Sequence, residues 1–289
     1  MPIDYPAILA LSFPEERWSW SEDQVILYAL AVGVPPLSAD PAESVLIHRR
    51  LGPDVLPSFM SVAGASGQLG ARRLGIDRRR RLHGDQSLIL HAPVPASGTA
   101  VTRASIEQCW DKGDRGAAII SRADTFDANG RPLATSRMTS FARGEGHFGG
   151  PRGHSEAPSL PLRAPDATID VAVSPYNAAL FALIRDRNPL HTDPEAAALA
   201  GFDRPVVHGL CLFGMACRLA TTRIEPLRGL RMVEQHVRFA APAHPGDQLT
   251  FAFWLESDLV RFGADAGERK ILTHGRMRFV AADYGASAL

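Results

Sequence analysis

The sequence predicts an α+β protein built from two similar units, each combining helices with an antiparallel sheet. Short apolar runs separated by turn signals favour strands that pair with their neighbours along the chain. A stretch dense in glycine and proline, 144–165, has no periodicity and separates the two units. We place the first unit at 1–150 and the second at 166–289, with 151–165 as the linker.

Two spacings suggest that the second unit repeats the first. Pro57 and Pro205 each open a helical stretch rich in small residues, and they lie 148 positions apart. The tripeptide Tyr-Ala-Leu at 28–30 resembles Phe-Ala-Leu at 181–183, at an offset of 153. Duplication and fusion of one helix-plus-sheet unit explains these matches most economically.

Helices and strands can be placed from caps, chain breakers and apolar patterns. Ser21 begins a capping box and Gly33 is a C-terminal stop, while Asp193-Pro194 is the N-terminal signal of another helix and not a catalytic pair. The expected helices are 21–32, 58–74, 175–184, 195–200 and 209–222. The expected strands are 88–90, 100–109, 117–126, 133–141, 169–173, 231–239, 248–256 and 270–281. Asn129-Gly130 marks a hairpin turn that wants positive φ.

Composition narrows the class of partner. Lysine and arginine together number 31 and balance 31 acidic residues, so the protein has no net charge that would attract it to nucleic acid or to an acidic membrane. The three cysteines suit neither a disulfide framework nor a Cys-x-x-Cys metal site. No apolar run approaches the roughly 20 residues that span a bilayer. We therefore expect a cytoplasmic protein without a signal peptide, a metal, a nucleic-acid partner or a membrane partner.

A turn in the second unit carries the first candidate for chemistry. Asp186 and His191 stand five positions apart, and Pro189 prevents regular helix between them. A turn that brings a carboxylate and an imidazole together suits acid–base chemistry on a bound water. The pair could also be structural, because Asp and His often stabilise loops. At the offset of 153 the first unit has Gly33 and Ser38, so only one unit carries the pair, which favours function.

The start of the helix at Gly209 supplies a second candidate. This helix is apolar on every side except at Arg218, which indicates burial. Free N–H groups at a helix start carry partial positive charge, and a glycine leaves them accessible. Such a donor would stabilise a carbonyl that gains enolate character, by roughly 2.7–4 kcal/mol in a transition state. The alternative is that Gly209 only allows close packing and that His208 covers the helix end.

Asp186-x-Asn188-Pro189-Leu190-His191 and Pro205-x-x-His208-Gly209-Leu210-Cys211 resemble the signature of the (R)-specific enoyl-CoA hydratases, the hydratase 2 branch of the MaoC-like dehydratases. The likeness extends over almost the whole chain. Further matches, in order, are 82–86 (Leu-His-Gly-Asp-Gln), 111–113 (Asp-Lys-Gly), 143–150, Arg238-Phe239 and Pro245-Gly246. The resemblance implies a double hotdog fold, in which each antiparallel sheet wraps a long central helix.

The resemblance also implies an activity. Water would add reversibly, in syn fashion, to a trans-2-enoyl-CoA and give the (3R)-hydroxyacyl-CoA, with no cofactor besides the thioester substrate. Asp186 and His191 would hold the water and move its protons, in roles that the sequence leaves open, and the Gly209 N–H would stabilise the enolate. The implied substrate contacts are His83, Gly84, Lys112, Arg187, Asn188, Pro189, Leu190, His208 and Phe239. Hotdog sheets usually pair edge to edge, so a homodimer is implied as well.

One departure from the family stands beside the pair. The family commonly has Tyr-Arg-Leu-Ser-Gly before the Asp, whereas this chain has Phe-Ala-Leu-Ile-Arg at 181–185. Ile184 and Arg185 therefore put bulk and a charge next to the turn, which predicts an altered substrate range or rate. Two other functions stay open on the same fold. One is a thioesterase whose carboxylate directs water at the thioester carbon, and the other is an acyl-CoA binding protein without activity.

The chain also has a local basic patch, made by Arg72, Arg73, Lys112 and the four arginines at 78–81. It could hold the phosphates of coenzyme A, or it could simply face solvent. Neither a Gly-x-Ser-x-Gly motif nor a glycine-rich phosphate loop occurs in the sequence, which argues against a serine hydrolase and a nucleotide enzyme.

Overall fold

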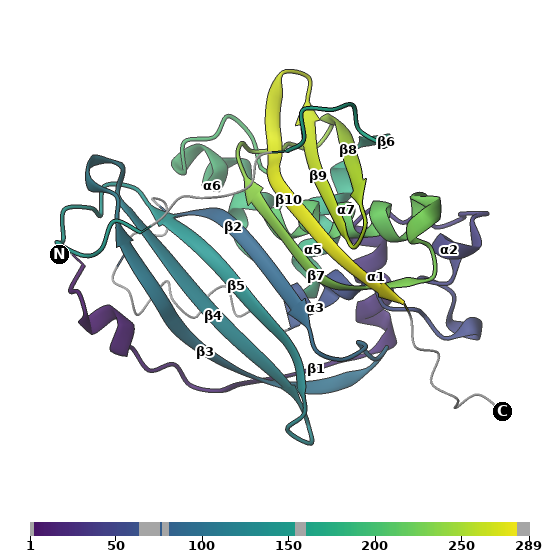
Figure 1. Ribbon diagram of the computed structural model, residues 1–289, viewed down its shortest axis with the longest axis horizontal. Helices are drawn as coiled ribbons and strands as arrows, with labels where there is room; N and C mark the ends of the chain where they lie inside the picture. The colour runs from purple at the N-terminus through teal and green to yellow at the C-terminus, as the bar shows by residue number, and fades with distance from the viewer. Residues whose placement is uncertain (1–2, 64–75, 77–80, 154–159, 282–289) are drawn as a thin grey trace.

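The structure is a computed structural model that describes residues 3–63, 76, 81–153 and 160–281. Ten strands form one antiparallel sheet in the order β1-β3-β4-β5-β2-β7-β10-β9-β8-β6. The sheet curves in front of helices α1, α5 and α7 in the view of Figure 1. Among the described helices none is both long and apolar enough to cross a lipid bilayer.

Half of the sheet comes from the N-terminal part of the chain. Its strands are β1 (Glu16–Trp20), β2 (Arg81–Leu90), β3 (Gly98–Asp111), β4 (Ala117–Asp127) and β5 (Pro132–Ala142). Its helical elements are η1 (Ala7–Ala10), α1 (Glu22–Ala31), α2 (Pro41–Ser44), η2 (Arg49–Leu51), η3 (Pro57–Phe59), α3 (Met60–Ala63) and η5 (Gly113–Arg115). Helix α1 begins at the predicted capping box, in which the Ser21 N–H donates to Gln24 Oε1 at 2.9 Å.

The C-terminal part of the chain supplies the other half. Its strands are β6 (Ala167–Ala172), β7 (Leu230–Phe239), β8 (Gln248–Glu256), β9 (Leu259–Ala266) and β10 (Arg269–Ala281). Its helical elements are α5 (Pro175–Ile184), η6 (Pro189–His191), α6 (Pro194–Leu199), α7 (Gly209–Arg223) and η7 (Glu225–Leu227). Asp193 caps α6 as expected, because its Oδ1 accepts the Glu195 N–H at 2.9 Å.

The two halves have the same strand order when each is followed from its outer edge: β1-β3-β4-β5-β2 and β6-β8-β9-β10-β7. Helices α1 and α5 match at the offset of 153 over their full length, and they pack together with the rings of Tyr28 and Phe181 6.0 Å apart. The halves join where β2 pairs with β7. The boundaries at 150 and 166 stay a prediction.

Two strands were not expected from the sequence. Strand β1 alternates tryptophans with polar residues over only five positions, which is a short signal. Strand β9 follows β8 after a turn of two residues, so the sequence has no clear chain breaker between β8 and β9. The predicted helix 58–74 forms η3 and α3 up to Ala63, and 64–74 lies outside the described residues. At the predicted hairpin Gly130 alone takes positive φ, 80°, because Asp127 Oδ1 holds the turn by accepting the Asn129 and Arg131 N–H groups.

The core lies between the sheet and α7, whose residues are nearly all buried. Gln235 on β7 fixes this helix against the sheet, donating from Nε2 to the Phe213 carbonyl at 2.8 Å. Arg218 is buried as well, and its charge is paired with Glu43 of the first half at 2.9 Å. On the side facing α1 the helix has Gly214, where an added Cβ would lie 2.5 Å from Tyr28 Oη and from Val32 Cγ1. Close contact between α7 and α1 therefore depends on the absence of a side chain there.

We expect Gly214→Ala to lower the free energy of unfolding. Overpacking of this kind costs about 1–3 kcal/mol, which exceeds the gain of at most about 1 kcal/mol in helix propensity. The urea midpoint should therefore fall, whereas Ala198→Val on the exposed side of α6 should change stability by no more than about 0.5 kcal/mol. A midpoint for Gly214→Ala equal to or above that of the wild type would contradict the close packing.

Candidate active site

A short turn between α5 and α6 carries Asp186 and His191. Its shape is set by local hydrogen bonds from side chains to backbone N–H groups: Asp186 Oδ1 accepts the Asn188 N–H at 3.2 Å, and Asn188 Oδ1 accepts the Leu190 N–H at 3.3 Å. Asn188 caps the single turn of η6, and Pro189 occupies its first position. The proline therefore bends the chain between the carboxylate and the imidazole, as the sequence predicted.

His191 is held by a carbonyl of the segment that leads into α7. Its Nδ1–H donates to the Val206 carbonyl at 2.8 Å, which leaves Nε2 as the nitrogen without a proton when the ring is neutral. Burial lowers the pKa of His191, although the hydrogen bond to Val206 and the charge of Asp186 oppose this shift. The ring is therefore neutral near pH 7 and offers Nε2 as a proton acceptor.

His208 lies against His191, with the ring centroids 3.6 Å apart and the planes 26° from parallel. It is only 1% exposed, and its Nε2–H donates to the backbone carbonyl of Asp186 at 3.1 Å. Burial, together with the neighbouring His191, lowers the pKa of His208 to about 2. A neutral His208 therefore fixes the main chain of the turn at the position of the catalytic candidate Asp186.

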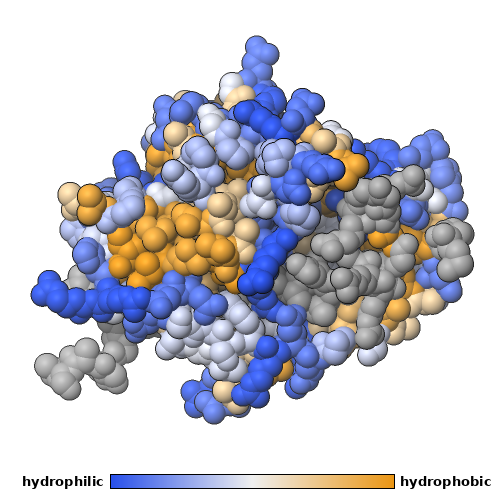
Figure 2. Space-filling model, turned by 180° about the vertical axis from the view of Figure 1, so that it is seen from behind, coloured by the Kyte–Doolittle hydropathy of each residue, from blue (hydrophilic) through white to orange (hydrophobic). Residues whose placement is uncertain are grey.

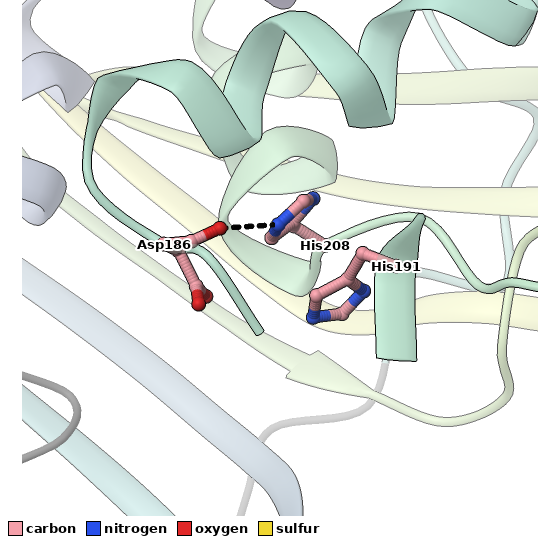
Figure 3. Close-up of side chains that lie close together, drawn as sticks. All are labelled: Asp186, His191 and His208. Atoms are coloured by element: carbon pink, nitrogen blue, oxygen red, sulfur yellow. Dashed lines mark hydrogen bonds between the residues drawn. The ribbon is translucent and has the colours of Figure 1, made fainter. Parts of the chain in front are cut away.

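Figure 3 shows the three side chains converging, with the Asp186 carboxylate and the His191 ring below His208. One carboxylate oxygen of Asp186 and one nitrogen of each histidine lie within 4.8 Å of one another. A water at about 2.8 Å from two such atoms can bridge them. One nitrogen of each ring is already bonded to a backbone carbonyl, so a single nitrogen of each histidine is left for a water or an ion.

The start of α7 faces the same region. Cys211 and Leu212 donate to the His208 carbonyl, so the first N–H groups of the helix, including that of Gly209, have no acceptor within it. A Cβ at Gly209 would lie 3.1 Å from the ring of Phe239, so the glycine lets this ring approach the helix end. Helix α7 thus begins with a partial positive charge beside the Asp186–His191 pair.

His83 joins the site from the first half. It lies on β2 just before Gly84, where the pairing with β5 shifts by one residue. Its ring packs on Phe239 with centroids 4.6 Å apart, and its Nε2–H donates to Gln86 Oε1 at 3.1 Å. Burial lowers the pKa of His83 to about 4, while the Gln86 hydrogen bond and the charge of Asp186 act in the opposite direction.

The other predicted contacts are divided between a distant strand and the turn itself. Lys112 follows β3, three strands away from β2, which corresponds to about 14 Å at a strand spacing of about 4.8 Å. Its Nζ lies 4.9 Å from the centre of the Trp110 ring and donates to the Arg152 carbonyl at 2.6 Å. Arg187 and Pro189 are exposed and Leu190 is half-buried. Of the basic patch, Arg72, Arg73 and 78–80 lie outside the described residues.

The loop after β5 is held next to Lys112 by a single carboxylate. Asp111 accepts the N–H groups of Gly113, His147 and Gly149 at 2.8–2.9 Å, and these bonds lower its pKa to about 2. The sequence singled out Asp111 through its motif but gave no structural role. Its contacts now explain how the loop is fixed beside the half-buried lysine.

The sequence did not predict which groups outside the turn hold it in place. The Val206 carbonyl carries no signal in a sequence, since every residue has one. Arg185 was expected to place its charge beside the pair, but its guanidinium extends to Glu16 on β1 and lies 5.0 Å from the centre of the Trp18 ring. Ile184 is buried in the core. No local pattern could have indicated a partner that lies 169 positions away.

Comparison with known proteins agrees with this architecture. Residues 18–144 match the MFE-2 hydratase 2 N-terminal domain, and residues 156–276 match the MaoC-like domain. Enoyl-CoA hydratase ChsH3 of Mycobacterium tuberculosis is 36% identical over 88% of this chain and 90% of the relative. The 3-hydroxyacyl-thioester dehydratase Y of the same organism is 32% identical over 97% and 100%. The solved structure of full-length peroxisomal multifunctional enzyme type 2 from Drosophila melanogaster superposes with a TM-score of 0.79 at 28% identity. That match covers 92% of this chain and about half, 48%, of the longer one.

The fold and the site together define a double hotdog protein with an Asp–His pair in its second half. The chain belongs to the hydratase 2 branch of the MaoC-like dehydratases. The fold and the family expected from the sequence are therefore confirmed.

The pKa values of the buried histidines predict how stability changes with pH. An exposed histidine has a pKa of about 6.5, whereas His83 and His208 are held at about 4 and about 2. Below pH 6.5 the unfolded chain binds protons that the folded chain excludes, so the free energy of unfolding falls. The slope is at most about 1.4 kcal/mol per pH unit for each such histidine.

The urea midpoint should therefore fall between about pH 6.5 and pH 4.5. In His208→Gln the fall of the urea midpoint, measured from that variant's own value at pH 7.5, should be smaller than in the wild type. Glutamine does not titrate, so the variant has one histidine fewer that binds a proton only after the chain unfolds. A wild-type midpoint that is constant over this range would contradict the neutral state of both rings.

Proposed function

We propose that this protein is a hydro-lyase that adds water reversibly to a trans-2-enoyl-CoA and forms the (3R)-hydroxyacyl-CoA. The observation that carries this proposal is the convergence of Asp186 and a neutral His191, spaced for one water, beside the free N–H groups of α7. The relatives named as an enoyl-CoA hydratase and as a hydroxyacyl-thioester dehydratase support the same reaction in its two directions.

In the proposed mechanism the water lies between the Asp186 carboxylate and His191 Nε2. His191 takes a proton as the water oxygen bonds to C3, and the electrons of the double bond move to the thioester oxygen as an enolate. The Gly209 N–H donates to that oxygen at the positive end of α7. The Asp186 charge stabilises the imidazolium, which returns the proton to C2 on the same face. The atoms of one water are thereby added across the double bond without a cofactor or a metal.

Substrate contacts follow from position. His83 and Phe239 line the site across from the turn, and Gly84 permits the bend of β2 there. The Asn188–Leu190 backbone shapes the turn on the other side. Arg187 is an exposed cation in the turn itself and Lys112 is a half-buried one three strands away from β2, and the phosphates of coenzyme A would meet these two side chains. His208, although predicted to contact substrate, is placed to position Asp186 instead, because its Nε2–H is bound to that residue's carbonyl.

The protein should hydrate crotonyl-CoA and longer trans-2-enoyl-CoA thioesters. Asp186→Asn and His191→Ala should each lower kcat by about 10²–10⁴-fold without unfolding the chain. Asp193→Asn is the matched control, because it alters the carboxylate that only caps α6. The assay follows loss of the conjugated enoyl absorbance together with release of free thiol.

The two readouts separate the alternatives. Thiol release with an unchanged enoyl signal would identify a thioesterase, and binding without either signal would identify an inactive acyl-CoA binding protein. Near-full activity in Asp186→Asn or His191→Ala would refute the assigned pair.

A homodimer is part of this proposal. The edge-to-edge pairing expected between two chains occurs within one chain, through β2 and β7. An apolar surface remains on the opposite face, behind α1 and α5 (Figure 2), with Tyr176 73% and Leu183 65% exposed on α5. Residues 26, 27 and 30 of α1 are half-buried apolar residues. Exposed apolar patches of this kind mark protein–protein interfaces.

Light scattering should give twice the mass of one chain, which is 31.2 kDa. Leu183→Asp places a charge on the apolar patch and should give the monomer. A monomeric wild type would exclude the dimer.

The compartment is proposed from the state of the cysteines. The three cysteines are free and buried, which suits a reducing compartment, and we retain the cytoplasm as the proposed location. Because one similar structure is that of a peroxisomal enzyme, a tagged full-length chain in its native cell would decide between the two.

A further inference from the structure

The N-terminal half lacks the Asp–His pair, yet one of its strands reaches the residue that precedes the pair. Arg185 is the last residue before Asp186, at the C-terminal end of α5. Its guanidinium pairs with the carboxylate of Glu16 on β1, and its Nη1 donates to the Val62 carbonyl at the end of α3 at 3.4 Å. The turn is therefore tied to two elements of the other half.

These contacts are formed in a partly buried place. The Arg185 side chain is 18% exposed and that of Glu16 is 33% exposed. The guanidinium stacks over Trp18, whose own ring packs on Phe59 with centroids 5.9 Å apart. A charge pair held on a packed aromatic has less freedom than one in solvent, so it can fix the backbone that carries it.

Three tethers thus define the position of the turn. His208 holds the Asp186 carbonyl, Val206 holds the His191 ring, and Arg185 holds the start of the turn against the first half. The first two come from the same half as the pair, and the Arg185 tether crosses between halves.

We propose that Arg185 is a positioning residue, which together with Glu16 holds Asp186 at the distance from His191 that one water can bridge. The inference rests on the proposed hydration reaction. Loss of the tether lets the carboxylate drift from the water and slows the chemical step, while the substrate still binds through groups that Arg185 does not touch.

Arg185→Met keeps an unbranched, flexible stem and removes the guanidinium with its charge. We expect it to lower kcat by about 10- to 100-fold with KM little changed. Glu16→Gln should lower kcat in the same way. The double variant should be no slower than the slower single variant, because both substitutions remove the same Arg185–Glu16 interaction. Arg185→Lys should recover part of the loss, since it keeps the charge but not the planar contact with Trp18.

Arg228→Met is the matched control. Arg228 forms another ion pair between the halves, with Asp40 at 2.8 Å, and the two side chains are 35% and 24% exposed. It lies beyond the C-terminal end of α7, away from Gly209. This variant should lose some stability and keep the wild-type kcat. Equal kcat in Arg185→Met and wild type would overturn the inference, as would an equal loss in Arg228→Met or fully additive losses at Arg185 and Glu16.

Hydrogen exchange tests the tether without relying on activity. In Arg185→Met the N–H groups of residues 188, 190 and 191, which are hydrogen-bonded within the turn, should exchange faster, while α6 exchanges as in the wild type. Unchanged exchange in the turn would reject the positioning role. If the wild type shows no hydration, the proposed function fails and exchange still decides whether Arg185 holds the turn.

Discussion

Two hydrogen bonds from imidazoles to backbone carbonyls hold the candidate active site together: His191 to Val206 and His208 to Asp186. Each uses one ring nitrogen as a donor and so determines which nitrogen lacks a proton. Burial keeps both rings neutral. Because Val206 and His208 lead directly into α7, the same two bonds position the His191 ring and the Asp186 backbone relative to the start of that helix. A free Nε2 on His191 and an ordered Asp186 carbonyl follow from this arrangement.

The two halves share one strand order, but the Asp–His pair lies in the second half. Gly33 and Ser38 occupy the positions of Asp186 and His191 in the first half, and Asp40-Pro41 matches Asp193-Pro194 at the same offset. There Ser38 donates to Glu43 at 2.8 Å, and Glu43 pairs with the buried Arg218. A Cβ at Gly33 would lie 3.7 Å from that guanidinium. The equivalent region of the first half is thus filled by an ion pair that joins the halves. The first half contributes to the active site through His83 and through Glu16, the partner of Arg185.

The sequence revealed those parts of the site that lie in short segments with distinctive residues. Asp186, Pro189 and His191 could be predicted together because the proline forces the bend, and Gly209 could be predicted because a buried helix needs a start. Strand β9 could not, since a two-residue turn leaves no break in composition between it and β8. The direction of the Arg185 side chain could not be predicted either. A long side chain next to a turn can extend to either side, and the group that decides, Glu16, is distant in sequence and near only after the halves have joined.

The stereochemical course of the reaction tests the central claim most directly. The protein should be incubated with crotonyl-CoA in ²H₂O, and the product analysed for configuration at C3 and for the position of deuterium at C2. One water held between Asp186 and His191 delivers its hydroxyl to C3 and its deuteron to C2 on the same face of the double bond. The predicted product is a single (3R)-hydroxybutyryl-CoA with deuterium added syn to the hydroxyl. A (3S) product, anti addition, or free coenzyme A in place of a hydroxyacyl thioester would contradict the account.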